Sequence, residues 1–186
     1  MTRIQNSKFK IQDLLILLLA IVGLSLTASA QKRDNLTDKE DLQVREAQEL
    51  DLRMKIFVKI IDRRFLAISD VNAPNNKQVQ KDTDLWGDLR IGTSQELFWD
   101  IQKTIDEAIL KLDDAAERDQ KNPLFSKAVH ILTEACQKWL PQFKSAIGKT
   151  TDEKEKGLIL ASIDYCHQVI EASTKVPKTE EKKKKN

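Results

Sequence analysis

Apolar residues recur at helical spacing from Thr37 to Ser69. They fall three or four positions apart, which places them on one face of a helix. Thr37 and Glu40 have the spacing of a capping box, a pattern that marks a helix start. The pattern predicts one long first helix of about 33 residues, roughly 50 Å at about 1.5 Å per residue. Its apolar positions are Ala47, Leu50, Met54, Phe57, Ile61, Phe65 and Ile68.

Three further stretches have the same periodicity, and each has its own start signal. Thr93 and Glu96 open the second, Asn122 and Pro123 the third, and Thr150 and Glu153 the fourth. Pro141 lies inside the third and should bend or break it. The connections after the second and third helices are short, which predicts antiparallel neighbours. The fold class is therefore all-α, an antiparallel four-helix bundle over residues 31–172.

Residues 70–93 interrupt the helical pattern with Pro74, Asn75, Asn76 and Gly87. We predict a long connection without regular structure between the first two helices, crossing one end of the bundle. Leu85 and Trp86 would pin it there. The spacing of Asp82, Asp84, Gly87 and Asp88 partly matches a calcium-binding loop, but Thr93 stands where the bidentate glutamate belongs. An acidic turn is the preferred interpretation.

The start of the chain has the order of a signal peptide. Basic residues at 3, 8 and 10 precede an apolar run over residues 14–26, followed by the small residues Ala28 and Ala30. The apolar run has roughly 13 residues, too few for a membrane-spanning helix. We predict that a signal peptide, residues 1–30, is cleaved after Ala30. The protein would then be exported by general secretion to a periplasm or the medium.

Charge limits the classes of partner. Removing three of the 31 basic and one of the 29 acidic residues with the signal peptide leaves 28 of each. A nucleic-acid-binding protein usually has a basic excess, so that class is not favoured. Residues 173–186 hold the run Lys182–Lys185 and no apolar residue after Val176, which predicts a disordered basic tail. Such a tail could bind anionic lipid surfaces or acidic envelope polymers, or simply aid solubility.

Cys136 and Cys166 are the two cysteines of the chain. Counted from the turn near Lys149, they fall at similar heights on the third and fourth helices. Export to an oxidising compartment allows a disulfide between them, although helix axes usually pack farther apart than a disulfide permits. A disulfide and two buried free thiols both remain open. His130 and His167 do not have the spacing that would join these cysteines in a metal site.

The sequence holds no glycine-flanked serine nucleophile and no phosphate-binding glycine loop. We therefore expect a non-enzymatic protein with no cofactor or metal. A basic stripe at Lys55, Lys59 and Arg63, together with Trp86, is the candidate partner-binding surface, with a solvated helix face as the alternative.

The preferred function is a protein-binding or structural module of the cell envelope, with a homodimer as one arrangement. A periplasmic chaperone that shields unfolded clients is the first alternative. A ligand carrier or enzyme with its site inside the bundle is the second.

Overall fold

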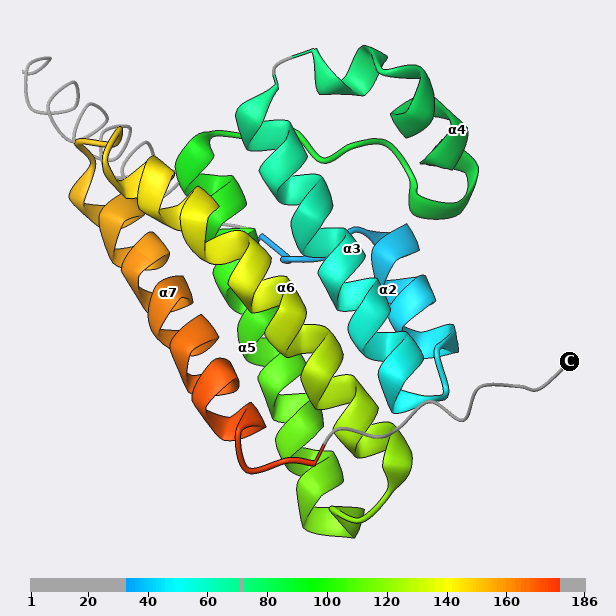
Figure 1. Ribbon diagram of the computed structural model, residues 1–186. Coiled ribbons are helices and arrows are strands. Elements are labelled where there is room, and N and C mark those ends of the chain that lie inside the picture. Colours follow the sequence, from blue (N-terminus) through cyan, green and yellow to red (C-terminus); the bar gives the residue numbers. More distant parts are fainter. Residues whose placement is uncertain (1–32, 71, 178–186) are drawn as a thin grey trace, which may run out of the picture. The chain divides into compact units, whose positions relative to one another are not determined.

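The computed structural model describes residues 33–70 and 72–177, and every regular element in them is helical (Figure 1). The chain divides after Arg33 into two units, and the description below concerns the second. Its elements are α2 (Asp38–Glu46), α3 (Leu50–Ser69), the short 3₁₀ helix η1 (Ala73–Asn75), α4 (Lys77–Trp86), α5 (Ser94–Asp119), α6 (Pro123–Ile147) and α7 (Glu153–Ser173). The all-α class is confirmed. The predicted signal peptide, with Ala28 and Ala30, and the Lys-rich run lie outside the described residues.

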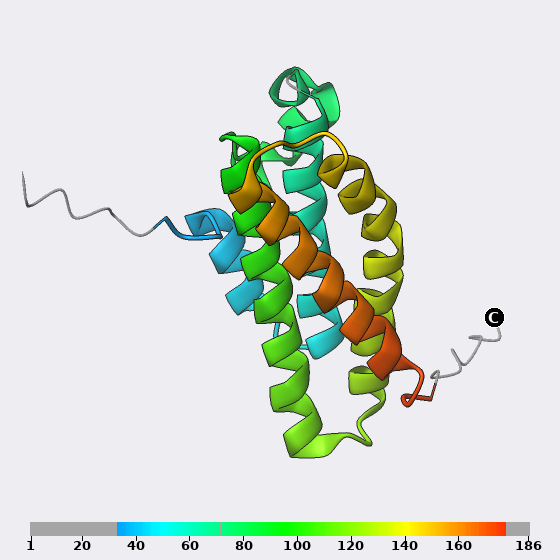
Figure 2. The ribbon, with the colours of Figure 1, turned by 90° about the vertical axis from the view of Figure 1, so that its left-hand side faces the viewer.

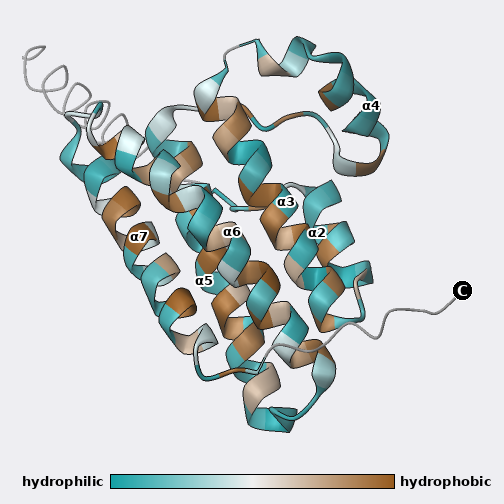
Figure 3. Cartoon of the chain, viewed as in Figure 1, coloured by the Kyte–Doolittle hydropathy of each residue, from teal (hydrophilic) through white to brown (hydrophobic). Residues whose placement is uncertain are grey.

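Helices α3, α5, α6 and α7 enclose the main hydrophobic core. Helix α3 packs against α5 and α6, and α7 packs against the same two helices (Figures 1 and 2). Hydrophobic segments of these helices face one another, while their outer sides are largely hydrophilic (Figure 3). The side chains with no exposed surface include Met54, Phe57, Ile101, Leu132 and Trp139.

The helix starts follow the sequence signals closely. A capping box joins Thr93 and Glu96 at α5, and the Asn122 side chain caps α6 ahead of Pro123. Helix α7 is capped by Asp152, whose Oδ1 accepts from the Glu155 amide at 2.8 Å, so the predicted Thr150–Glu153 box is wrong. Pro141 lies within α6, and the helix continues past it to Ile147.

The predicted long first helix is wrong, because the chain leaves the helix after Glu46 and restarts at Leu50. Helix α2 folds back beside α3 (Figure 1). Arg53 stabilises the bend by donating from Nε and Nη2 to the Ala47 carbonyl oxygen, at 3.1 and 2.8 Å. The predicted capping box of Thr37 and Glu40 is present at the start of α2.

The connection predicted to lack regular structure contains η1 and α4. The Asn76 side chain caps α4 by accepting from the Gln78 amide at 2.9 Å, and Gly87 ends the helix at φ 72°. Ala73, Val79 and Leu89 form a small second core against Leu66 and Ala67 of α3. Helices α2 and α4 also contact each other, so together they cover part of α3.

Within residues 33–70 and 72–177, no helix is both long enough and apolar enough to cross a membrane.

Candidate binding cleft

A cleft of about 780 Å³ opens where the ends of α3, α5, α6 and α7 meet. We call it the end cleft. Its apolar lining comes from Phe65 and Ile68 of α3, Phe98 of α5, and Pro141 and Ala146 of α6. Its polar lining comes from the ends of all four helices and from the α6–α7 connection: Ser69, Ser94, Gln142, Ser145, Lys149, Thr150, Thr151, Asp152 and Glu155.

Two aromatic rings, Phe65 and Phe98, line the end cleft, and a third, Phe143, packs against both. Phe65 lies edge-on to Phe98 and Phe143, with ring centroids 6.4 and 5.0 Å apart, and Phe98 lies 6.3 Å from Phe143. Edge-to-face contacts of this kind add to the stability gained by burying the rings. Pro141 also lines the cleft, two residues before Phe143 in α6, and it has no amide hydrogen to give the helix. The apolar lining therefore rests on a packed aromatic cluster, while the turn of α6 at Pro141 has one hydrogen bond fewer.

The rim of the end cleft has polar side chains that do not take part in intramolecular hydrogen bonds or ion pairs within the part of the chain that the structure describes. Ser94, Ser145, Lys149, Thr151 and Glu155 line it, and their side chains make no hydrogen bond or ion pair with other described residues. An apolar lining below such groups is the usual composition of a binding site.

A buried charge cluster lies elsewhere, between α2, α3 and α5. Arg64 has no exposed surface and donates to both carboxylate oxygens of Glu40, at 2.8 and 2.6 Å. Its Nε also donates to Asp100 Oδ2 at 3.2 Å, and Arg90 pairs with the same oxygen at 3.1 Å. Burial raises the pKa of Glu40, but the hydrogen bonds and charge of Arg64 outweigh it, so the pKa lies below its usual value of 4.5.

Two residues of the basic stripe predicted as a partner-binding surface, Lys59 and Arg63, make intramolecular contacts. Lys59 pairs with Asp82 of α4 at 3.0 Å, and this pairing lowers the pKa of Asp82. Arg63 is buried and donates to the carbonyl oxygens of Gly87 and Asp88, at 2.8 and 3.0 Å. The structure thus places both residues against the α4 segment.

The two other members of the predicted surface lie apart from these contacts. Lys55 is exposed on α3. Trp86 is half-buried and packs against the main core. Of the four residues, Arg63 is buried, so a partner at this surface would meet Lys55, Lys59 and Trp86.

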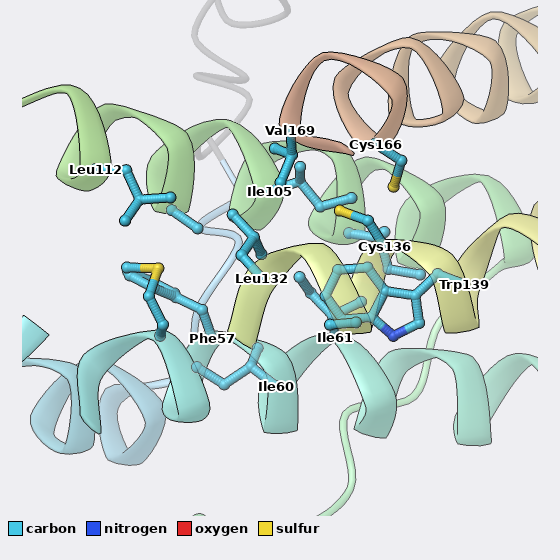
Figure 4. Close-up of a cluster of buried hydrophobic side chains, with 14 of the residues drawn as sticks. Phe57, Ile60, Ile61, Ile105, Leu112, Leu132, Cys136, Trp139, Cys166 and Val169 are labelled. Carbon is cyan, nitrogen blue, oxygen red and sulfur yellow. The ribbon is translucent and has the colours of Figure 1, made fainter. Parts of the chain in front are cut away.

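Cys136 and Cys166 are both buried and free. They lie next to each other across α6 and α7, as their register predicts (Figure 4). A hydrogen bond with the Cys166 thiol and burial raise the pKa of the Cys136 thiol. Of the two interpretations left open by the sequence, the structure has the pair of free thiols and not the disulfide.

Sequence reasoning missed both Arg64 and Asp100, although a signal was present. Arg64 lies between Ile61 and Ile68 on the apolar face of its helix, and Asp100 lies beside Leu97 and Ile101 on another. A charged residue on an apolar face needs a buried partner.

The end cleft had no comparable signal, because its residues come from four separate helix ends. Among the described residues, no group of three or more His, Cys, Asp or Glu side chains is placed to hold a metal ion.

Comparison with known proteins gave no match to a family model, to a curated protein or to a solved structure.

Proposed function

We propose that this chain is an exported, non-enzymatic protein of the cell envelope that binds a partner protein through the end cleft. Export by general secretion and removal of residues 1–30 are part of this proposal. Their support is the order of basic, apolar and small residues that ends at Ala28 and Ala30. The Lys-rich tail would add a salt-dependent attraction to anionic lipid or envelope polymer.

We also propose that α3, α5, α6 and α7 form an antiparallel four-helix bundle. The helix contacts are compatible with this arrangement. In Figures 1 and 2, α3 and α6 follow one direction, and α5 and α7 the opposite one. The packed pairs α3–α5 and α6–α7 are therefore antiparallel, whereas the packed pairs α3–α6 and α5–α7 are parallel. In such a bundle the end cleft would be the open end of the core.

The end cleft is the observation that carries the binding function. Its volume of about 780 Å³ lies in the range of about 300–1,000 Å³ that is typical of ligand sites. An apolar side chain of the partner would contact Phe65, Phe98 and Pro141, while its backbone would reach the hydroxyl groups of the rim. Asp152 and Glu155 outnumber Lys149 in the lining, which favours a partner segment that also has a basic residue.

Filling the end cleft tests this function. Ser145→Trp places a large side chain in the cleft, whereas the neighbouring Lys144→Trp places one on an exposed position of the same helix outside the lining. A photo-crosslinking residue at Thr151, introduced into the full chain in cells, reports what occupies the cleft. We expect one saturable partner that is lost in Ser145→Trp and kept in Lys144→Trp.

The other outcomes separate the alternatives. Equal capture in both variants would exclude the end cleft as the binding site. Capture of many unrelated unfolded proteins would favour a chaperone. A small molecule that co-purifies with the wild type and is absent from Ser145→Trp would favour a ligand carrier.

A further inference from the structure

Helix α2 is attached to the rest of the fold mainly by polar contacts. Its buried apolar side chain is Val44, with Ala47 at its end. Glu40 is held by Arg64, and Lys39 donates to the carbonyl oxygens of Thr83 and Asp84, at 3.3 and 3.1 Å. These binding partners all lie beyond the bend that joins α2 to α3. An identical surface on a second copy of the chain would offer the same contacts.

The bend consists of residues that favour a helix. Ala47, Gln48 and Glu49 are non-helical in the structure, yet all three residue types have high helix propensity. The apolar spacing also passes through the bend without a break, from Val44 to Ala47, Leu50 and Met54. Local preference and observed conformation therefore disagree at this bend.

Helix α3 begins without a side-chain cap at its N-cap residue. Its N-cap residue, Glu49, makes no side-chain capping hydrogen bond. The first amide groups of a helix have no partner within that helix. If residues 47–49 became helical, the carbonyl groups of residues 46–48 would accept hydrogen bonds from the amides of residues 50–52.

We propose that two copies of this chain exchange α2. In the exchanged form, residues 47–49 are helical, α2 and α3 are one continuous helix, and α2 packs on α3 of the second copy. Glu40 of each copy then pairs with Arg64 of the other. The exchange keeps the contacts that α2 makes beyond the bend, and backbone hydrogen bonds at residues 47–49 replace the Arg53–Ala47 contact. In this way domain swapping produces a dimer at little cost.

The variant Glu49→Pro distinguishes the form with a bend at residues 47–49 from the exchanged form with a continuous helix. Glu49 has φ −83°, close to the value of about −65 ± 15° that proline requires, so proline fits the bend. In the continuous helix, proline would remove a hydrogen bond and clash with the preceding turn. Glu49→Ala removes the same side chain and favours the helix, so it is the matched control.

The experiment uses the full chain produced in cells, purified, unfolded in urea and refolded at high concentration, about 1 mM. Light scattering after size separation then gives the dimer fraction. We expect a dimer in the wild type and in Glu49→Ala, and a dimer fraction at least ten-fold lower in Glu49→Pro. A wild type that stays monomeric, or a Glu49→Pro dimer as abundant as the wild-type dimer, would overturn the proposal.

A second measurement identifies the contact within the dimer. Copies labelled with ¹⁴N and ¹⁵N are mixed before refolding. A carbodiimide then joins Lys39, whose Nζ lies 3.1 Å from the backbone carbonyl oxygen of Asp84, to the carboxylate of that same residue. Exchange of α2 gives linked peptides with one light and one heavy partner. A dimer whose Lys39–Asp84 links are all uniform in isotope would form through another surface, and the proposal would be wrong.

Discussion

Arg64 of α3 and Glu40 of α2 form a bidentate ion pair with N–O distances of 2.8 and 2.6 Å, and neither side chain has exposed surface. Asp100 of α5 joins the same guanidinium group. The pair connects residues 24 positions apart and holds α2 against α3. In the chain that reverses at residues 47–49, this pair is the buried polar contact that keeps α2 on α3.

Removing Arg64 should destabilise the protein strongly. Arg64→Met would leave Glu40 without its main partner in a buried site, and loss of one member of a buried ion pair typically costs about 3–5 kcal/mol. Urea unfolding, followed by circular dichroism, measures the loss. The control is Arg45→Ala, which removes an exposed pair with Asp41 and should change the free energy of unfolding by at most about 0.5 kcal/mol. Equal effects of the two substitutions would contradict a structural role for the buried pair.

Stability should fall in acid, and Glu40 should be one of its causes. Its pKa is below the usual value of 4.5 in the folded protein, so the folded state binds fewer protons than the unfolded state. The stabilisation is complete above pH 4.5 and is lost as the pH falls through the folded pKa. Asp51 should also contribute to the loss of stability in acid. Burial raises its pKa, but the pairing with Lys127 outweighs this effect, so the pKa is lowered.

The urea midpoint measured from pH 7 to pH 3 checks this expectation. Glu40→Gln should be less stable at pH 7 and should lose less stability on acidification than the wild type. Identical acid profiles for the two proteins would show that Glu40 is not responsible.

The all-α class and the start signals of α5 and α6 could be predicted because both depend on local sequence. Residues 47–49 could not be predicted as a bend, since they favour a helix. Helix α4 was missed because Asn76, its cap, lies among residues that also suit a loop. The adjacent positions of Cys136 and Cys166 could be predicted by counting residues along two helices from their connection. The end cleft could not be predicted, because it depends on how four helix ends meet in space.

Gly87 should be difficult to replace. Its φ of 72° and ψ of 179° lie in a region that is essentially restricted to glycine, where other residues cost about 1–3 kcal/mol. A Cβ atom there would lie 3.4 Å from the Lys39 side chain, an ordinary van der Waals contact, so the cost comes from the backbone conformation. Gly87→Ala should therefore loosen α4 first, which hydrogen exchange of the α4 amides would show as faster exchange while the α6 amides stay protected. The matched control, Gly157→Ala, adds a Cβ with no atom within 4 Å and should leave both helices protected.

The thiols of Cys136 and Cys166 should be present but unreactive in the folded protein. Both are buried, and the raised pKa of Cys136 disfavours the thiolate, which is the reactive form. A thiol reagent at pH 8, without added reductant, should react at least a hundred-fold more slowly with the native protein than with the protein in urea, where it should titrate two thiols per chain. If no thiol titrates in urea until a reductant is added, the chain isolated from cells contains a disulfide. The packing of α6 against α7 around these residues would then differ from the structure described above, because a disulfide requires the two backbones to approach closely.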